Sequence, residues 1–303
     1  MKKQIIVVAG CLVALLSTVI LSCKKDRVPQ DDYKDMDSFY SNHEEEEQEY
    51  TIDSTGNCPL VCKKGTKICV GADMFEFTGG GAVTYPFQLK VIELYSIKDM
   101  ILRRIPSVAS GNVLETSAEV RVRPFKNGTE VFLKSGRKYW LETAALPSTN
   151  NSMQSYYGYD SNGSNNWTSN ISDFIPGFTD TLSSVVASST YYTTTPATTG
   201  WFSPAKIFPA TNSSLTLTVP GTDTQNIQVY VSFANFKGVM RIENLTTTSL
   251  PLGESVTLIA FGQKQNNDFV MDQQTFTVSA NQQLPLNMQV VTENDILNAL
   301  AAL

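Results

Sequence analysis

Short runs in which apolar and polar residues strictly alternate constrain this chain more than any other feature. The clearest runs are 83–91, 118–123, 215–219, 227–233 and 256–260. A period of two turns one face of a strand toward a core and leaves the other face in water. The pattern therefore predicts an all-β chain of antiparallel strands.

Turn residues separate these runs. Asn127-Gly128, between two alternating segments, is the strongest hairpin signal because both residues tolerate positive φ. Several short strands at near-regular spacing favour an antiparallel sandwich. We expect two β-sandwich-like domains, over residues 58–147 and 200–303, and a Ser/Thr/Asn/Tyr-rich connecting region over 148–199.

One helix is expected at the C-terminus. Thr292 and Asp295 have the spacing of a capping box at a helix start. Ile296, Leu300 and Leu303 then follow at helical spacing, which puts them on one face. The chain therefore ends in a short amphipathic helix.

Aromatic residues in and beside the connecting region are candidate ligand contacts. Aromatic faces stack on sugar rings, and neighbouring Asn and Asp side chains can bind hydroxyls. Aromatic residues also fill sandwich cores and contact partner proteins, so packing and protein binding stay open. The candidates are Tyr157, Tyr159, Trp167 and Trp201.

The N-terminus has the features of a secretory signal peptide over residues 1–22. Lys2 and Lys3 precede an apolar stretch over 5–20, which is short against the roughly 20 residues of a membrane span. The stretch ends in Ile-Leu-Ser-Cys23, which resembles the lipobox of bacterial lipoproteins. The alternative is an ordinary signal peptide with a chance cysteine. We expect Cys23 to carry the lipid anchor.

Residues 23–57 are predicted to form a disordered acidic tether. Like charges repel, and a segment with few aliphatic residues buries little apolar surface. A docking strip for a basic partner is the alternative interpretation. The acidic residues are Asp31, Asp32, Asp35, Asp37, Glu44, Glu45, Glu46, Glu47, Glu49 and Asp53.

Three cysteines follow the tether, namely Cys58, Cys62 and Cys69. In an oxidising compartment an odd count suggests one disulfide and one remaining thiol. We expect Cys69 to pair with Cys58 or Cys62, with three free thiols as the alternative. A zinc site is not expected, because the only histidine is His43 in the acidic segment and a fourth cysteine is missing.

Charge and residue content narrow the function classes. The net charge is −6, and removal of Lys2 and Lys3 leaves 21 cations against 29 acids, or −8. Nucleic-acid binding is therefore not expected. His43 cannot act as a catalytic base from the tether, and alternation puts Glu119 on a polar strand face. We expect no enzyme activity, metal or cofactor. The role is either a structural or protein-interaction module, or glycan binding through the aromatic region.

The stretches 91–101, 114–116, 125–128, 200–202, 252–261 and 292–296 resemble a family of uncharacterised Bacteroidota lipoproteins with ZU5-like β-sandwich domains. This resemblance covers most of residues 65–303. It implies a lipid-anchored cell-envelope protein, favours the outer membrane, leaves its periplasmic or surface face open, and implies no activity. Ser54 and Thr181 lie in triplets that resemble the O-glycosylation sites of that phylum. In the first of these stretches, 91–101, the family has a strand followed by a turn.

Overall fold

The computed structural model describes residues 33–55, 58–145, 149–161, 164–173, 184–219 and 225–303. Strands make up 48% and helices 11% of the chain, and nearly all strand pairs are antiparallel. The predicted all-β fold class is therefore confirmed. Residues 1–22 and Cys23 lie outside the described residues.

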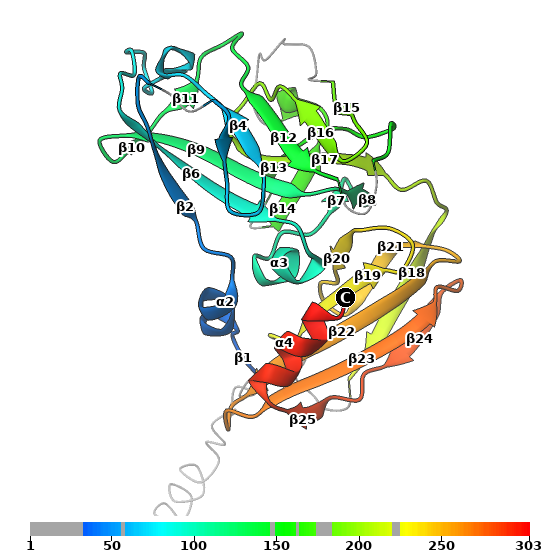
Figure 1. Cartoon of the computed structure of the whole chain (residues 1–303). Helices are drawn as coiled ribbons and strands as arrows, with labels where there is room; N and C mark the ends of the chain where they lie inside the picture. The colour runs from blue at the N-terminus through cyan, green and yellow to red at the C-terminus, as the bar shows by residue number, and fades with distance from the viewer. Residues whose placement is uncertain (1–32, 56–57, 146–148, 162–163, 174–183, 220–224) are drawn as a thin grey trace, which may run out of the picture.

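The first sandwich has a large sheet in the order β14-β13-β17-β9-β6-β2 (Figure 1). β10 pairs with β9 at one edge, and β7 and β8 attach through β17. Its strands are β2 (Gln48–Ile52), β6 (Phe87–Leu94), β7 (Val108–Ala109), β8 (Asn112–Thr116), β9 (Glu119–Lys126), β10 (Thr129–Glu130), β13 (Gln154–Ser161), β14 (Ser164–Thr168) and β17 (Gly200–Ile207).

A smaller sheet in the order β15-β16-β12-β4-β3 packs against it, with Ile68 and Leu141 meeting Leu89 and Val120 in one core. A separate pair, β5 (Phe75–Glu76) and β11 (Phe132–Leu133), completes the domain. The strands of the smaller sheet are β3 (Leu60–Val61), β4 (Lys67–Cys69), β12 (Trp140–Ala144), β15 (Val186–Ala187) and β16 (Tyr191–Thr194).

The second sandwich packs the sheet β20-β19-β22-β23-β25 against the sheet β21-β18-β24. β1 extends the first of these by pairing with β22, and β18 pairs with β24 in parallel. The strands are β1 (Tyr33–Lys34), β18 (Asn212–Thr218), β19 (Gln228–Phe233), β20 (Val239–Arg241), β21 (Thr246–Pro251), β22 (Ser255–Lys264), β23 (Phe269–Thr277), β24 (Gln282–Pro285) and β25 (Gln289–Val291).

Three α-helices, α2 (Asp37–His43), α3 (Ile97–Leu102) and α4 (Glu293–Ala301), lie where the two sandwiches meet (Figure 1). Their apolar side chains share one core with residues of both sandwiches. Two short 3-10 turns occur at η1 (Ala72–Met74) and η2 (Ile171–Asp173). Among the described residues, no helix is long and apolar enough to cross a membrane.

Backbone hydrogen bonds also join the two sandwiches. The N–H groups of Ser107 and Thr116 donate to the carbonyls of Val239 and Lys237, each at 2.8 Å. Gly238 lies between these acceptors, and a Cβ there would stand 2.4 Å from the Leu114 carbonyl oxygen. Only glycine allows this approach of two backbones, so the junction is a fixed contact.

The prediction of a disordered tether is wrong for residues 33–52. β2 pairs with β6 along its whole length, and Met36, Phe39 and Tyr40 are buried. The acidic side chains do not repel the chain into solvent, because basic residues of the first sandwich neutralise them. Glu44 pairs with Arg103 at 2.5 Å, and Glu45 pairs with Lys64 at 2.8 Å.

The predicted boundary at residue 200 is also wrong. β17 begins there, but it pairs with β13 and β9 inside the first sandwich. The connecting region 148–199 supplies β13 to β16 to that same domain. These polar strands do not show the alternation pattern, because a few aromatic residues, among them Tyr157 in β13, Trp167 in β14 and Tyr192 in β16, anchor them in the apolar cores.

Two local predictions are confirmed and one changes. Asn127 and Gly128, at φ of 53° and 78°, turn β9 into β10. Thr292 and Asp295 form a capping box, and Ile296 and Leu300 are buried. The family-like segment after β6, expected to be a turn, is the helix α3, which Ser96 and Asp99 cap in the same way.

Candidate functional site

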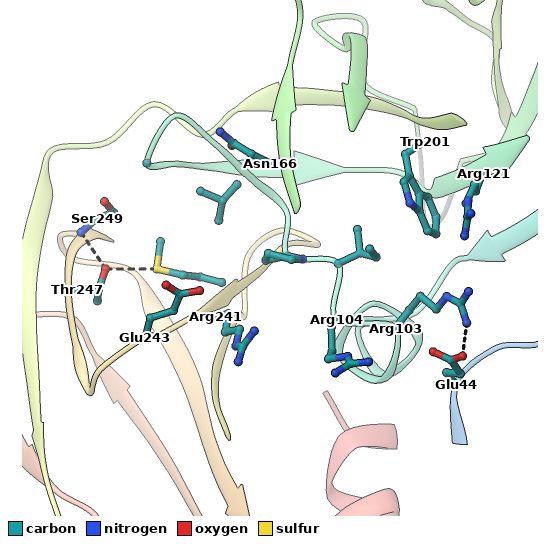
Figure 2. A pocket seen from close by; sticks show the side chains of 15 residues that line it. Glu44, Arg103, Arg104, Arg121, Asn166, Trp201, Arg241, Glu243, Thr247 and Ser249 are labelled. Atoms are coloured by element: carbon teal, nitrogen blue, oxygen red, sulfur yellow. Dashed lines mark hydrogen bonds and ion pairs between the residues drawn. The ribbon is translucent and has the colours of Figure 1, made fainter. Parts of the chain in front are cut away.

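A cleft of about 810 Å³ opens at the junction of the two sandwiches. The first sandwich contributes Arg103, Arg104, Arg121 and Trp201, and the second contributes the residues around β20 and β21. Figure 2 shows Arg121 beside Trp201 at one side of the cleft, and Arg241, Thr247 and Ser249 at the other. Both domains are therefore needed to form it.

Arg103 and Arg104 follow directly after α3 and are already paired. Arg103 lies 2.5 Å from Glu44, and Arg104 lies 2.6 Å from Asp37. The Arg104 guanidinium also lies 4.9 Å from the ring centroid of Tyr40. The N-terminal segment thus anchors one wall of the cleft.

Arg121 and Trp201 stand opposite each other on the paired strands β9 and β17. The guanidinium carbon lies 5.8 Å from the centroid of the indole. Within the described part of the chain, Arg121 has no hydrogen bond or ion pair. Burial, followed by repulsion from Arg123, lowers the pKa of Arg121. This guanidinium therefore lines the cleft with unused donors.

The opposite wall carries hydroxyl groups and one more guanidinium. Arg241 donates to Oε1 of Gln228 at 3.3 Å. Thr247 Oγ1 accepts the backbone N–H of Ser249 at 3.2 Å, which orients this end of β21. Counting the lining residues, four arginines face two acids, Glu44 and Glu243, although the chain as a whole is acidic.

This set of groups suits non-covalent recognition of an oxygen-rich ligand. Guanidinium groups bind oxyanions with paired hydrogen bonds, and hydroxyl groups orient polar ligand atoms. The volume falls within the roughly 300–1,000 Å³ of ligand pockets. The cleft is therefore the candidate binding site.

The four aromatic residues that the sequence suggests as ligand contacts differ in their exposure and position. Tyr157 and Trp167 are 0% and 1% exposed, so the prediction that they contact a ligand is wrong. Tyr157 packs edge-on against Phe202, and the Trp167 indole donates to the Pro106 carbonyl at 2.9 Å. Tyr157 is therefore part of the core of the first sandwich, and Trp167 is part of the core at the junction.

Tyr159 supports the site from outside. Its hydroxyl accepts a hydrogen bond from Nδ2 of Asn166 at 3.1 Å, and Asn166 lines the cleft. Of the four, Trp201 alone lines the cleft itself. The arginines were missed, because their chain positions lie far apart and alternation marks them only as solvent-facing.

The cysteines form a structural site within the first sandwich. Cys58 and Cys69 are joined by a disulfide, one of the two expected pairings. Cys62 is a buried free thiol, and burial, aided by Glu93, raises its pKa to about 12. In the part of the chain that the structure describes, no group of three metal-ligand side chains occurs.

Glu119 is not on a wet face, contrary to the expectation from alternation. It is fully buried, because the loop carrying Lys237 of the second sandwich covers that face of β9. Its Oε1 accepts from the Ser107 hydroxyl at 2.9 Å. Burial raises the pKa of Glu119 to about 8 and lowers the pKa of Lys237 to about 8.

The modification candidates lie away from the cleft. Ser54 is exposed, beside an Asp53 carboxylate that accepts from the N–H and hydroxyl of Thr55. Thr181 and Cys23 lie outside the described residues. No family model, curated protein or solved structure matches the chain. The Bacteroidota resemblance therefore stays a prediction, and the cleft is interpreted from its geometry.

Proposed function

We propose that this chain is a non-enzymatic, lipid-anchored cell-envelope protein that acts as an interaction module and binds its ligand in the junction cleft. Cys23 holds it at the membrane, with the outer membrane favoured. The observation that carries the proposal is the cleft, which both sandwiches line and which presents the Arg121 guanidinium, held over Trp201 and without a hydrogen bond or ion pair to any described residue.

The fixed junction supports binding to a preformed site. The Lys237 ammonium donates to the Tyr95 carbonyl at 3.1 Å and to the carbonyl of Ser117, across the junction. The buried apolar side chains of α2, α3 and α4 also pack against both sandwiches. A preformed site avoids part of the ordering cost of association.

Glycan binding is a second candidate, and Trp201 favours it. The indole lines the cleft and is half-buried, so it offers an apolar surface beside polar groups. Such a combination is how proteins contact a sugar ring and its hydroxyls. The binding surface would then be the cleft, and not the aromatic connecting region as a whole.

Hydrogen exchange on the full chain tests the proposal. Amides of 103–111 and 239–249 should exchange more slowly when detergent-solubilised protein is titrated with an envelope extract. Ser249→Trp places a large ring in the cleft and should abolish the protection. Thr248→Trp is the matched control, because successive side chains of β21 face opposite ways and Thr248 is exposed.

Two results would contradict the proposal. Protection elsewhere, unchanged by Ser249→Trp, would place binding outside the cleft. A saturating extract that protects no amide would remove the binding role altogether.

A further inference from the structure

We propose that the cleft selects a carboxylated oligosaccharide, whose carboxylate binds the Arg121 guanidinium while its sugar rings lie along Trp201. This inference deepens the proposed function and rests on it. It names the ligand class, which the fold and the sequence leave open.

The anion preference follows from the state of each cation at the cleft. Arg103 and Arg104 are satisfied by Glu44 and Asp37. Arg121 is held against Trp201 and makes no hydrogen bond or ion pair among the described residues, although the Glu47 and Glu130 carboxylates act on it from a longer distance. A half-buried guanidinium in that condition is a site for an oxyanion, which its planar fork can bind through two hydrogen bonds.

The surrounding field also favours an anion. The whole chain has 29 Asp and Glu against 23 Lys and Arg, so without the two acids and four arginines of the cleft it has 27 acids against 19 cations. At the cleft the balance is reversed, with four arginines and two acids among the lining residues. An anionic ligand is therefore drawn to this position and repelled from most others.

The saccharide part follows from the rest of the lining. Ser249 contributes a hydroxyl with no hydrogen bond in the described chain, and Arg241 offers further donors. Among the described residues that line the cleft, Trp201 is the only aromatic one. A cleft of about 810 Å³ has the size of a site for a small ligand such as a short oligosaccharide. A protein partner would instead need a contact surface of about 800 Å² on each side.

The test is calorimetric titration of the detergent-solubilised full chain with defined probes. Trigalacturonic acid and sialyllactose present the carboxylate from two sources, uronic and sialic. Methyl-esterified trigalacturonate and lactose are their uncharged controls, and hexaglutamate presents carboxylates without sugar. We expect saturable binding of at least one carboxylated sugar, and at least tenfold weaker binding of its control and of hexaglutamate.

Variants assign the effect to Arg121. Arg121→Met should weaken binding of the carboxylated probe at least tenfold. Arg121→Lys should retain part of the affinity, because lysine keeps the positive charge but lacks the planar guanidinium that forms two parallel hydrogen bonds. Arg137→Met is the matched control, because Arg137 is exposed, lies outside the cleft and should change nothing. Affinity should also fall as salt rises, since salt screens the ion pair.

Each contrary result overturns the inference. Equal binding of the methyl ester would show that the carboxylate is not required, and equal binding of hexaglutamate would show that the sugar is not required. Unchanged affinity in Arg121→Met would show that Arg121 does not bind the ligand. If Arg121→Met fails to fold, Arg121→Lys and the esterified probe decide. If none of the probes binds while the extract still protects the cleft amides, the ligand class is wrong and the proposed function stands; if that protection is absent too, both fail.

Discussion

The hydroxyl groups of Tyr40 and Tyr230 lie 3.1 Å apart in the core, although 190 residues separate them in the chain. Tyr40 also donates to Oε1 of Gln228 at 3.2 Å. The acidic N-terminal segment is therefore part of the junction between the sandwiches. Its contacts with α4, such as His43 Nε2 to Glu293 Oε1 at 2.8 Å, bring α2 and α4 together.

Phe39→Ala tests this insertion. Phe39 is 4% exposed and packs near Phe261 and Phe269, so its truncation should lower the free energy of unfolding by about 3–5 kcal/mol. Ser38→Ala, at an exposed position of the same helix, should change it by less than about 0.5 kcal/mol. Urea denaturation measures both; equal and small effects would mean that α2 is not part of the folded body.

Glu119 predicts a pH dependence of stability. Its pKa is raised from 4.5 to about 8, so the folded state binds more protons than the unfolded state between these values. Stability from this group is present below pH 4.5 and is lost as pH rises through 8. Lys237, whose pKa falls from 10.5 to about 8, has the opposite effect, since its contribution to the free energy of unfolding grows as pH rises from about 8 toward 10.5.

Glu119→Gln should therefore flatten the loss of unfolding free energy between pH 5 and pH 8. The relevant neighbours are Ser107, which donates to Glu119, and Asp99, which acts on Lys237. Glu46→Gln is the control, since Glu46 is exposed. Denaturation curves at pH 5, 6.5 and 8 measure the slope, and parallel slopes for wild type and Glu119→Gln would refute the assignment.

The cysteines predict a defined thiol count. Native protein at pH 8 should react with no thiol reagent, because Cys58 and Cys69 are bridged and Cys62 is buried with a pKa near 12. Unfolding without reductant should expose one thiol in the chain that follows Cys23. Replacing Cys58 and Cys69 by serine should cost roughly 2.5–3 kcal/mol in the chain-entropy model for a loop this short. Three reactive thiols in native protein would contradict the pairing.

The anchor predicts a processing defect. Lipidation requires the Cys23 thiol, so Cys23→Ala should leave an unlipidated and uncleaved precursor. Intact mass and detergent partitioning of the exported protein measure this, and Cys62→Ala serves as the control substitution. A cleaved Cys23→Ala protein that still partitions into detergent would show that the lipid anchor is not at this residue.

Strands with one apolar face could be predicted from the sequence, as β6, β9 and β22 show. The C-terminal helix could be predicted as well, because Thr292 and Asp295 mark its start locally. For β19, the sequence predicts only one of two buried faces. Val229 and Val231 face the core of the second sandwich, while Tyr230 faces the core shared with α2. Both faces of that strand are covered, which a period of two cannot reveal.

The cleft could not be predicted because its residues meet only through the junction. Arg121 and Trp201 are neighbours by the pairing of β9 with β17, across 80 positions of chain. Pairing of non-consecutive strands is not encoded in any local pattern. Local charge also misled at Asp37 and Glu44, whose partners Arg104 and Arg103 follow more than 50 residues later.

The most direct test of the binding account is a side-by-side titration of Ser249→Trp and Thr248→Trp with the carboxylated oligosaccharide that wild type binds. Both variants add an indole to β21, but only position 249 lines the cleft. The account predicts one saturable site in Thr248→Trp with wild-type affinity, and at least tenfold weaker binding in Ser249→Trp with unchanged thermal stability. Equal affinities in the two variants would contradict it.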